Sequence, residues 1–201
     1  PKSILSAIGR AKDEMLTPEQ LEHNNNGDFR MGVIAKIYKS YQQTLKSSNA
    51  VDFDDIIVLT VRLFEEYPDV LEHYQNRYKY IMVDEYQDTN HAQYKLVSML
   101  AGKHKNLCVV GDDDQSIYKF RGATIENILS FENQFSGAKV IRLKQNYRCT
   151  QRILDAANAV IANNTERKGK TLWTDNGEGE QVKLYRACDE QGEARFIVDT
   201  V

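Results

Sequence analysis

The sequence predicts an α/β fold, in which a parallel β-sheet with flanking helices follows a helical segment. Short apolar runs at 80–83 and 107–110 have the length of buried strands, and a third strand is predicted at 139–143. Helical patterns lie between these runs, and strands that alternate with helices are typical of a parallel sheet covered on both faces. Residues 1–48 show only the helical spacing of apolar side chains, so this part is predicted to be helical.

Two helical stretches are expected before the first strand. Apolar residues from Ile34 to Leu45 recur at three- and four-residue steps, and Asp28 is placed to cap this helix. A further helix is expected over 52–67. Pro68 should end it, because proline cannot donate a backbone hydrogen bond inside a helix.

The rest of the chain alternates predicted strands and helices. Strands are expected at 80–83, 107–110, 139–143 and 182–185. Helices are expected at 90–100, 124–131, 150–163 and 190–201. Gly102 should stop the first of these four helices and Thr124 should cap the second, whereas the polar, glycine-rich stretch 164–180 is predicted to be a loop.

The composition bounds the class of protein. The chain has 201 residues, 41% of them hydrophobic, which is enough for a core and leaves room for one large domain or parts of two. No apolar run approaches 18 residues, so no membrane partner is expected. With 26 basic and 29 acidic residues the net charge is −3, which excludes a generally basic nucleic-acid coat but not a local binding track.

The cysteines and the chain ends lead to two further expectations. Cys108, Cys149 and Cys188 are far apart and fit neither a disulfide framework nor a zinc site, which favours a cytoplasmic protein. The chain opens at Pro1 without a leader and stops inside a predicted helix, so we expect an internal fragment.

Two carboxylates follow the first predicted strand. Asp84 and Glu85 would lie at its carboxyl end, where parallel sheets bind ligands. This placement suits a nucleotide-bound Mg²⁺ held by Asp84, with Glu85 taking a proton from the water that attacks the γ-phosphate. The alternative is a pair of solvated acids where a strand leaves the core.

Gln115 follows the second predicted strand, after Gly111 and three acids at 112–114. If the two strands are parallel neighbours, Gln115 lies beside Asp84 and Glu85. Its amide can hydrogen-bond both a phosphate oxygen and a water molecule without changing protonation. Two alternatives stay open: the acids could form a nuclease metal site together with Asp84 and Glu85, or the segment could be a solvated turn.

Two further groups of residues could bind nucleic acid or nucleotide. Tyr118, Phe120 and Arg121 could stack bases and contact phosphates, at ~1–3 kcal/mol per stacked base, or the two rings could simply belong to the core. After the third predicted strand, Arg148 could stabilise charge on a phosphate and Tyr147 could offer its ring to a purine.

The segment Gly169-Lys170-Thr171 superficially resembles the end of a phosphate-binding loop. Such a loop requires a glycine at position 164 and a preceding strand, whereas position 164 is Asn and a predicted helix precedes it. We therefore expect no lysine cradle for phosphates in this chain.

Taken together, the motifs closely resemble those of the UvrD/Rep/PcrA group of superfamily-one DNA helicases. The matching segments, in order along the chain, are Val51–Asp55, Val83–Asn90, Val110–Ala123, Leu143–Arg148 and Lys170–Thr174. The resemblance covers nearly the whole chain. It departs at Phe120, where the family often has Trp, and the family's phosphate loop and second catalytic arginine are expected outside the chain.

The resemblance implies a fold of the P-loop NTPase class, in which two RecA-like domains clamp ATP. Residues 1–50 would then be part of a helical inserted subdomain. Residues 51–138 would be the second half of the first RecA-like domain, and residues 139–201 the start of the second.

The resemblance also implies roles for individual residues. Those for ATP and Mg²⁺ are Asp84 and Glu85 as magnesium-binding and catalytic acids, Gln115 and Arg148 as catalytic γ-phosphate contacts, and Tyr147 as the adenine-stacking ring. The implied track for single-stranded DNA is Tyr118, Phe120 and Arg121.

The implied function is ATP-driven translocation on single-stranded DNA with duplex unwinding, in DNA repair or replication. Partners would be single-stranded DNA, duplex junctions, ATP and repair proteins, and the fragment alone should be inactive. The alternatives are the helicase portion of a helicase–nuclease and a non-catalytic DNA-interaction domain.

Overall fold

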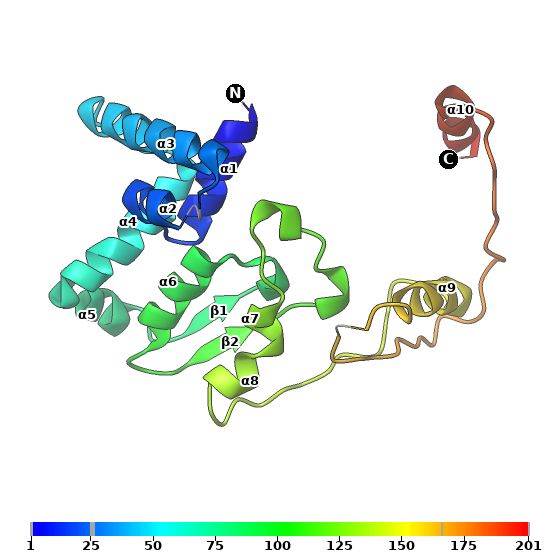
Figure 1. The fold of residues 1–201 in the computed structure, drawn as a ribbon. Coiled ribbons are helices and arrows are strands. Elements are labelled where there is room, and N and C mark those ends of the chain that lie inside the picture. The colour runs from blue at the N-terminus through cyan, green and yellow to red at the C-terminus, as the bar shows by residue number, and fades with distance from the viewer. Residues whose placement is uncertain (1, 25–26, 166, 201) are drawn as a thin grey trace. The chain divides into compact units, whose positions relative to one another are not determined.

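The structure is a computed structural model that describes residues 2–24, 27–165 and 167–200, and for Arg121 the backbone alone. It divides into two compact units, Pro1–Lys139 and Val140–Val201. Figure 1 colours the chain from its N-terminus to its C-terminus. Within the described residues, no helix is both long and apolar enough to cross a membrane.

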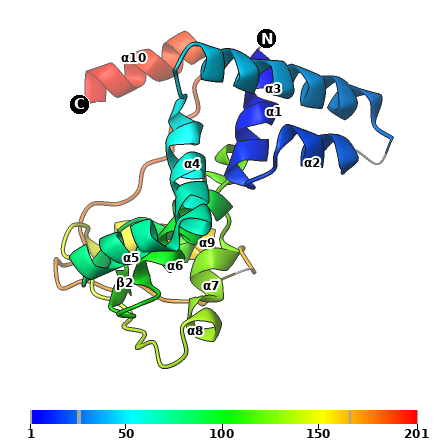
Figure 2. The ribbon, with the colours of Figure 1, turned by 90° about the vertical axis from the view of Figure 1, so that its left-hand side faces the viewer.

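The N-terminal part is helical, as predicted, and consists of α1 (Lys2–Asp13), α2 (Pro18–His23) and α3 (Phe29–Ser47). Asp28 caps α3, since its Oδ1 accepts hydrogen bonds from the backbone N–H groups of Arg30 (2.8 Å) and Met31 (3.3 Å). Figure 2 shows α1 crossing α3, with α2 packed beside α3. Their shared core consists of Ala7, Ile8, Ala11, Leu21, Ile34, Ala35 and Tyr38.

Two further helices lead to the sheet: α4 (Phe53–Glu66) and α5 (Pro68–Arg77). The prediction that Pro68 ends the first helix is confirmed. Pro68 also occupies the first turn of α5, a position where proline is favoured because the missing N–H has no helical partner there. The sequence reading did not anticipate α5.

The sheet has two parallel strands, β1 (Ile81–Val83) and β2 (Leu107–Val109), in the register Ile81 to Leu107. The connection between them is α6 (His91–Ala101), capped by Asn90. Both α4 and α5 pack against α6. The α/β class and the parallel pairing are therefore confirmed.

The prediction that both faces of the sheet are covered is wrong. Burial alternates along each strand, so Met82 is 78% exposed and its register partner Cys108 is exposed as well. Within the described residues, no helix covers the face that carries these two side chains.

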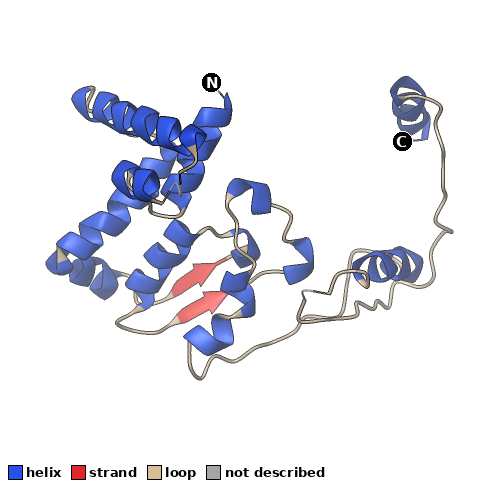
Figure 3. Cartoon of the chain, viewed as in Figure 1, coloured by secondary structure: helices blue, strands red, loops and turns tan. Residues whose placement is uncertain are grey.

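The strands predicted at 139–143 and 182–185 do not form. Both stretches lack regular structure, and Figure 3 draws strands only for β1 and β2. Nearby, the described residues make a single isolated bridge between Gln145 and Trp173. A sequence run becomes a strand only where a second strand satisfies its backbone groups. The described residues of the second unit form no ladder beyond that bridge.

The helix predicted at 124–131 is divided into α7 (Glu126–Leu129) and α8 (Phe131–Gln134). Thr124 makes no side-chain cap; its backbone carbonyl accepts from the N–H of Asn127 instead. In the second unit, α9 (Gln151–Ile161) and α10 (Glu190–Thr200) confirm the last two predicted helices.

Candidate functional site

The carboxyl ends of the two strands are held together by backbone hydrogen bonds beyond the ladder itself. The N–H of Val110 donates to the carbonyl of Val83 (2.8 Å), and the N–H of Tyr86 donates to the carbonyl of Val110 (2.9 Å). The segments that follow β1 and β2 therefore leave the same edge of the sheet. This edge carries Asp84 and Glu85 on one side and Gln115 on the other.

Asp84 and Glu85 are both exposed at this edge. The backbone of Glu85 is left-handed, with φ of 50°, and the Oδ1 of Asp84 accepts its N–H at 2.9 Å. A non-glycine residue in this conformation costs about 1–3 kcal/mol, and such strain is concentrated at functional sites. The short 3₁₀ turn η1 (Tyr86–Asp88) follows at once.

Gln87 links the two strand ends, a role that sequence reasoning missed. Its side chain is 1% exposed. Its Nε2 donates to the Oε2 of Glu85 (2.7 Å), and its Oε1 accepts from the backbone N–H of Asp112 (2.9 Å). The Nε2 of Gln115 in turn donates to the Oδ2 of Asp112 (2.7 Å). Glu85 and Gln115 thus lie at the two ends of one hydrogen-bonded chain.

Gly111 provides the space for this link. A Cβ at this position would lie 2.6 Å from the Oε1 of Gln87, 2.8 Å from the Cδ1 of Ile128 and 3.2 Å from the backbone N of Tyr86. The glycine turn expected after the second strand is therefore required by close packing of the two strand ends.

An open hollow of about 390 Å³ adjoins the acids. Its lining residues are Val83, Asp84, Glu85, Asp88, Thr89, Gln93, Leu96 and Val97. The Oδ1 of Asp88 is buried there without a hydrogen-bond partner among the described residues. The hollow thus combines a partly apolar wall with carboxylate oxygens.

The acids Asp112, Asp113 and Asp114 bring carboxylate oxygens within 4.8 Å of one another. Asp112 also caps the 3₁₀ turn η2 (Asp113–Gln115), accepting the N–H of Asp114 at 3.0 Å. Among the described residues, Asp84 and Glu85 do not join this group. The five-carboxylate arrangement of the nuclease alternative is therefore absent from the described residues.

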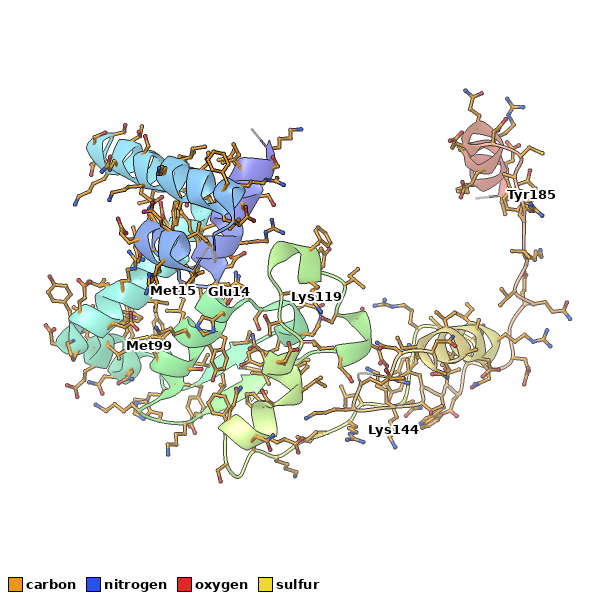
Figure 4. The ribbon with its side chains drawn as sticks, in the orientation of Figure 1. Glu14, Met15, Met99, Lys119, Lys144 and Tyr185 are labelled. Atoms are coloured by element: carbon orange, nitrogen blue, oxygen red, sulfur yellow. The ribbon has the colours of Figure 1, made fainter. Side chains whose placement is uncertain are left out.

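Tyr118 and Phe120 are surface residues rather than core residues, being 37% and 70% exposed. Their ring centroids lie 6.0 Å apart at an interplanar angle of 42°. Figure 4 labels Lys119, which stands between them in the sequence and begins the 3₁₀ turn η3 (Lys119–Arg121). The side chain of Arg121 lies outside the described residues.

In the second unit, the segment 145–149 forms a side-chain-stabilised turn. The Oδ1 of Asn146 accepts the N–H groups of Arg148 (2.9 Å) and Cys149 (2.7 Å). Tyr147 is 79% exposed and donates its hydroxyl to the Oε1 of Gln145 (3.0 Å). Arg148 is exposed as well. Both candidate side chains therefore face solvent on a well-defined turn.

Asp13, at the end of α1, joins the helical part to the segments near the strand ends. Its Oδ1 accepts from the Nδ2 of Asn90 (2.6 Å), and a Cβ on Gly122, just after η3, would lie 2.6 Å from its Oδ2. Burial, with repulsion from Asp54 and Glu14, raises the pKa of Asp13 to about 6. Sequence reasoning gave no signal for this contact.

Two family models match the chain. Residues 1–136 match the UvrD/REP helicase N-terminal domain, and residues 141–201 match the UvrD-like helicase C-terminal domain. The chain belongs to the UvrD/Rep helicase family. The resemblance drawn from the sequence motifs is thereby confirmed.

Curated relatives in the UvrD/Rep family match over essentially the whole chain. An ATP-dependent DNA helicase PcrA of Staphylococcus epidermidis (strain RP62A) is 53% identical over 201 residues, or 100% of this chain. A protein of the same name from Staphylococcus aureus (strain Mu50) is 52% identical over 198 residues, or 98% of this chain. In each case the match spans only 27% of the length of the relative.

Proposed function

We propose that this chain is part of an ATP-dependent DNA helicase, in which it supplies part of the hydrolysis site and part of the track for single-stranded DNA. The observation that carries the proposal is the shared strand edge, where Glu85 and Gln115 are connected through Gln87 and Asp112. The names of the staphylococcal relatives support the same activity.

The side chains at the strand edge fit magnesium and a triphosphate. Carboxylate oxygens are the ligands that Mg²⁺ prefers, and Asp84 and Glu85 present them beside an open hollow. Asp84 and Glu85 would hold the ion, while Arg148 and Tyr147 would contact the γ-phosphate and adenine. When bound, ATP would supply the phosphoanhydride bond, and Mg²⁺ would neutralise charge that develops on the phosphates.

Glu85 and Gln115 divide the remaining chemistry. A carboxylate at the strand end can accept the proton of the attacking water, and Glu85 is exposed, with its Oε2 held by the Nε2 of Gln87. The Gln115 amide can bond water or a phosphate oxygen, but here it donates to Asp112. The Nε2 carries a second N–H, so it could donate to a phosphate oxygen while the bond to Asp112 is kept.

Tyr118 and Phe120 would bind single-stranded DNA by stacking on its bases. Both rings are exposed, and they follow Gln115 by only three and five residues. A change in the position of Gln115 on hydrolysis can thus reach the strand-binding rings through a short segment. This link is our proposal for how hydrolysis drives translocation and duplex unwinding, with DNA junctions and repair proteins as further partners.

The test uses a full-length protein that contains this chain. Glu85→Gln should lower DNA-stimulated ATP hydrolysis by at least about 100-fold, the scale of a lost general base. Gln115→Ala should separate hydrolysis from unwinding, measured on a labelled duplex with a single-stranded tail. Phe29→Ala, which removes an exposed ring at the start of α3, is the matched control and should change neither. Wild-type hydrolysis and unwinding in both site variants would contradict the proposal.

A further inference from the structure

The proposed site contains a buried amide that the family roles leave without a function. Gln87 lies between the two strand ends with only 1% of its surface exposed. Buried amides generally make hydrogen bonds. The partners of Gln87 are Glu85, in the segment after β1, and Asp112, in the segment after β2. Gln87 is therefore placed to fix the positions of both groups.

The orientation of the amide is fixed by its neighbours. The backbone N–H of Asp112 is a donor, so the atom that faces it at 2.9 Å must be the carbonyl oxygen of Gln87. The amino group must then face the carboxylate of Glu85, 2.7 Å away, with the Oδ2 of Asp88 at 3.4 Å. A flipped amide would place an oxygen against a carboxylate and an N–H₂ against an N–H.

The surrounding backbone leaves this amide little room. Gly111 is close enough that any Cβ would collide with the Oε1 of Gln87 at 2.6 Å. On the other side Glu85 has a left-handed backbone, which sets the direction in which its own side chain leaves the turn. The carboxylate of Glu85 is therefore held from two sides, by its backbone conformation and by the Gln87 donor.

We propose that Gln87 is a positioning residue that holds the Glu85 carboxylate in place and ties it to the β2 end that carries Gln115. This inference rests on the proposed function, because it assigns Gln87 a role through Glu85. Gln87 acts only through the Glu85 carboxylate and is assigned no contact with the nucleotide or the attacking water. Its donor to Glu85 and its acceptor toward Asp112 are separate, so the two contacts can be removed separately.

Two variants separate the contacts. Gln87→Glu keeps an oxygen acceptor toward the N–H of Asp112 but replaces the donor to Glu85 by a repelling oxygen. Gln87→Met removes both contacts at similar volume. Gln75→Glu is the matched control, because Gln75 also donates its Nε2 (2.7 Å, to the carbonyl of Met99) but lies on α5, outside the proposed site.

The first readout needs no nucleotide and uses this chain. Hydrogen exchange of the Asp112 backbone amide, followed by NMR, should stay slow in Gln87→Glu. It should accelerate by about tenfold in Gln87→Met, the factor expected for loss of one hydrogen bond. Gln75→Glu should leave the exchange of this amide unchanged. Equal exchange rates in all variants would overturn the link to β2.

The second readout is DNA-stimulated ATP hydrolysis by the full-length protein. Both Gln87 variants should lower kcat by about 10- to 100-fold, the cost of a misplaced catalytic group, while KM for ATP stays within about twofold. Gln75→Glu should retain wild-type kcat. Wild-type kcat in Gln87→Glu would overturn the proposal. Loss of the fold in both variants, measured by circular dichroism, would make Gln87 a core residue and overturn it as well.

Glu85→Gln in the same assay distinguishes the two levels of inference. If this variant lowers hydrolysis by at least about 100-fold while Gln87→Glu keeps the wild-type kcat, the positioning role fails and the proposed function stands. If Glu85→Gln hydrolyses ATP like the wild type, the proposed function fails, and the role of Gln87 fails with it.

Discussion

Lys12 places its ammonium group in the interior of the helical part, with its side chain 0% exposed. Its Nζ lies 2.5 Å from the Oδ2 of Asp52 and 2.9 Å from the Oδ1 of Asp55, and above the ring of Tyr41 at 5.2 Å. The hydroxyl of Tyr41 also donates to Asp52 (3.0 Å). The cluster joins α1, α3 and the start of α4. Its buried charges are tolerated there because each is paired with a charge of opposite sign.

Removing Lys12 should leave buried carboxylates without a counter-charge. We expect Lys12→Met to lower the free energy of unfolding of the chain by about 3–5 kcal/mol, measured by urea denaturation. Lys39→Met is the control: Lys39 pairs with Glu19 at the surface, with side chains 55% and 62% exposed, so its loss should cost less than about 1 kcal/mol. Similar losses in the two variants would contradict this account of the cluster.

Asp13 should make stability depend on pH. Its pKa is raised from 3.8 to about 6, so the folded chain binds this proton more tightly than the unfolded chain, and stability falls as the pH rises from about 4 through 6. Asp13→Asn should therefore be more stable than the wild type at pH 8, by on the order of 1 kcal/mol. The difference should disappear toward pH 4.

Thermal unfolding at pH 4.5 and pH 8 measures the effect of Asp13→Asn. Asp69→Asn, at an exposed position in the first turn of α5, serves as the control, and its difference in stability from the wild type should change little between the two pH values. A destabilised Asp13→Asn variant at pH 8 would mean that the charged form of Asp13 is favoured in the fold, contrary to the prediction.

The sequence allowed prediction of some site residues but not others. The proximity of Glu85 and Gln115 could be predicted because each residue lies shortly after a predicted strand. Gln87 and Asp13 could not, because what defines them is a partner 25 or 77 positions away in the chain. A side chain whose role depends on such a distant partner has no local signature.

At the scale of elements, helices were easier to predict than strands for a physical reason. A helix satisfies its backbone groups locally, and its ends are marked by residues such as Asp28 and Pro68. A strand depends on a neighbour elsewhere in the chain. The runs at 80–83 and 107–110 pair with each other, whereas the run at 139–143, which contains Lys139 and Arg142, has no strand partner among the described residues.

The cap of α3 offers a direct test of local control. Asp28→Ala removes the acceptor for the N–H groups of Arg30 and Met31 and should destabilise the chain by about 1 kcal/mol. Asp28→Asn retains a side-chain oxygen and should stay within a few tenths of a kcal/mol of the wild type. Chemical denaturation followed by circular dichroism measures both. Equal losses would show that the charge of Asp28, and not its cap, is what matters.

At the scale of the whole molecule, the chain consists of two units joined near residue 140. The two family models meet in the same region, one ending at 136 and the other beginning at 141. The family resemblance implies a domain boundary at 138/139, which stays a prediction about the parent fold.

Limited proteolysis should reveal this organisation. Lys139, Arg142 and Lys144 are exposed in a stretch without helix or strand, so trypsin should reach them early. The stable product should be an N-terminal fragment that ends between 139 and 144 and retains α1 to α8, identified by mass spectrometry. Early cuts inside α3 or α4 would contradict the compactness of the first unit.

The uncovered face of the sheet has a chemical consequence. Met82 and Cys108 are register partners and lie open to water, which places a thioether beside a thiol on the same surface. Both sulfur groups are readily oxidised, and a sulfoxide turns an apolar side chain into a polar one. Peroxide should thus make this surface of the sheet more polar, whereas side chains buried in the helical core are protected.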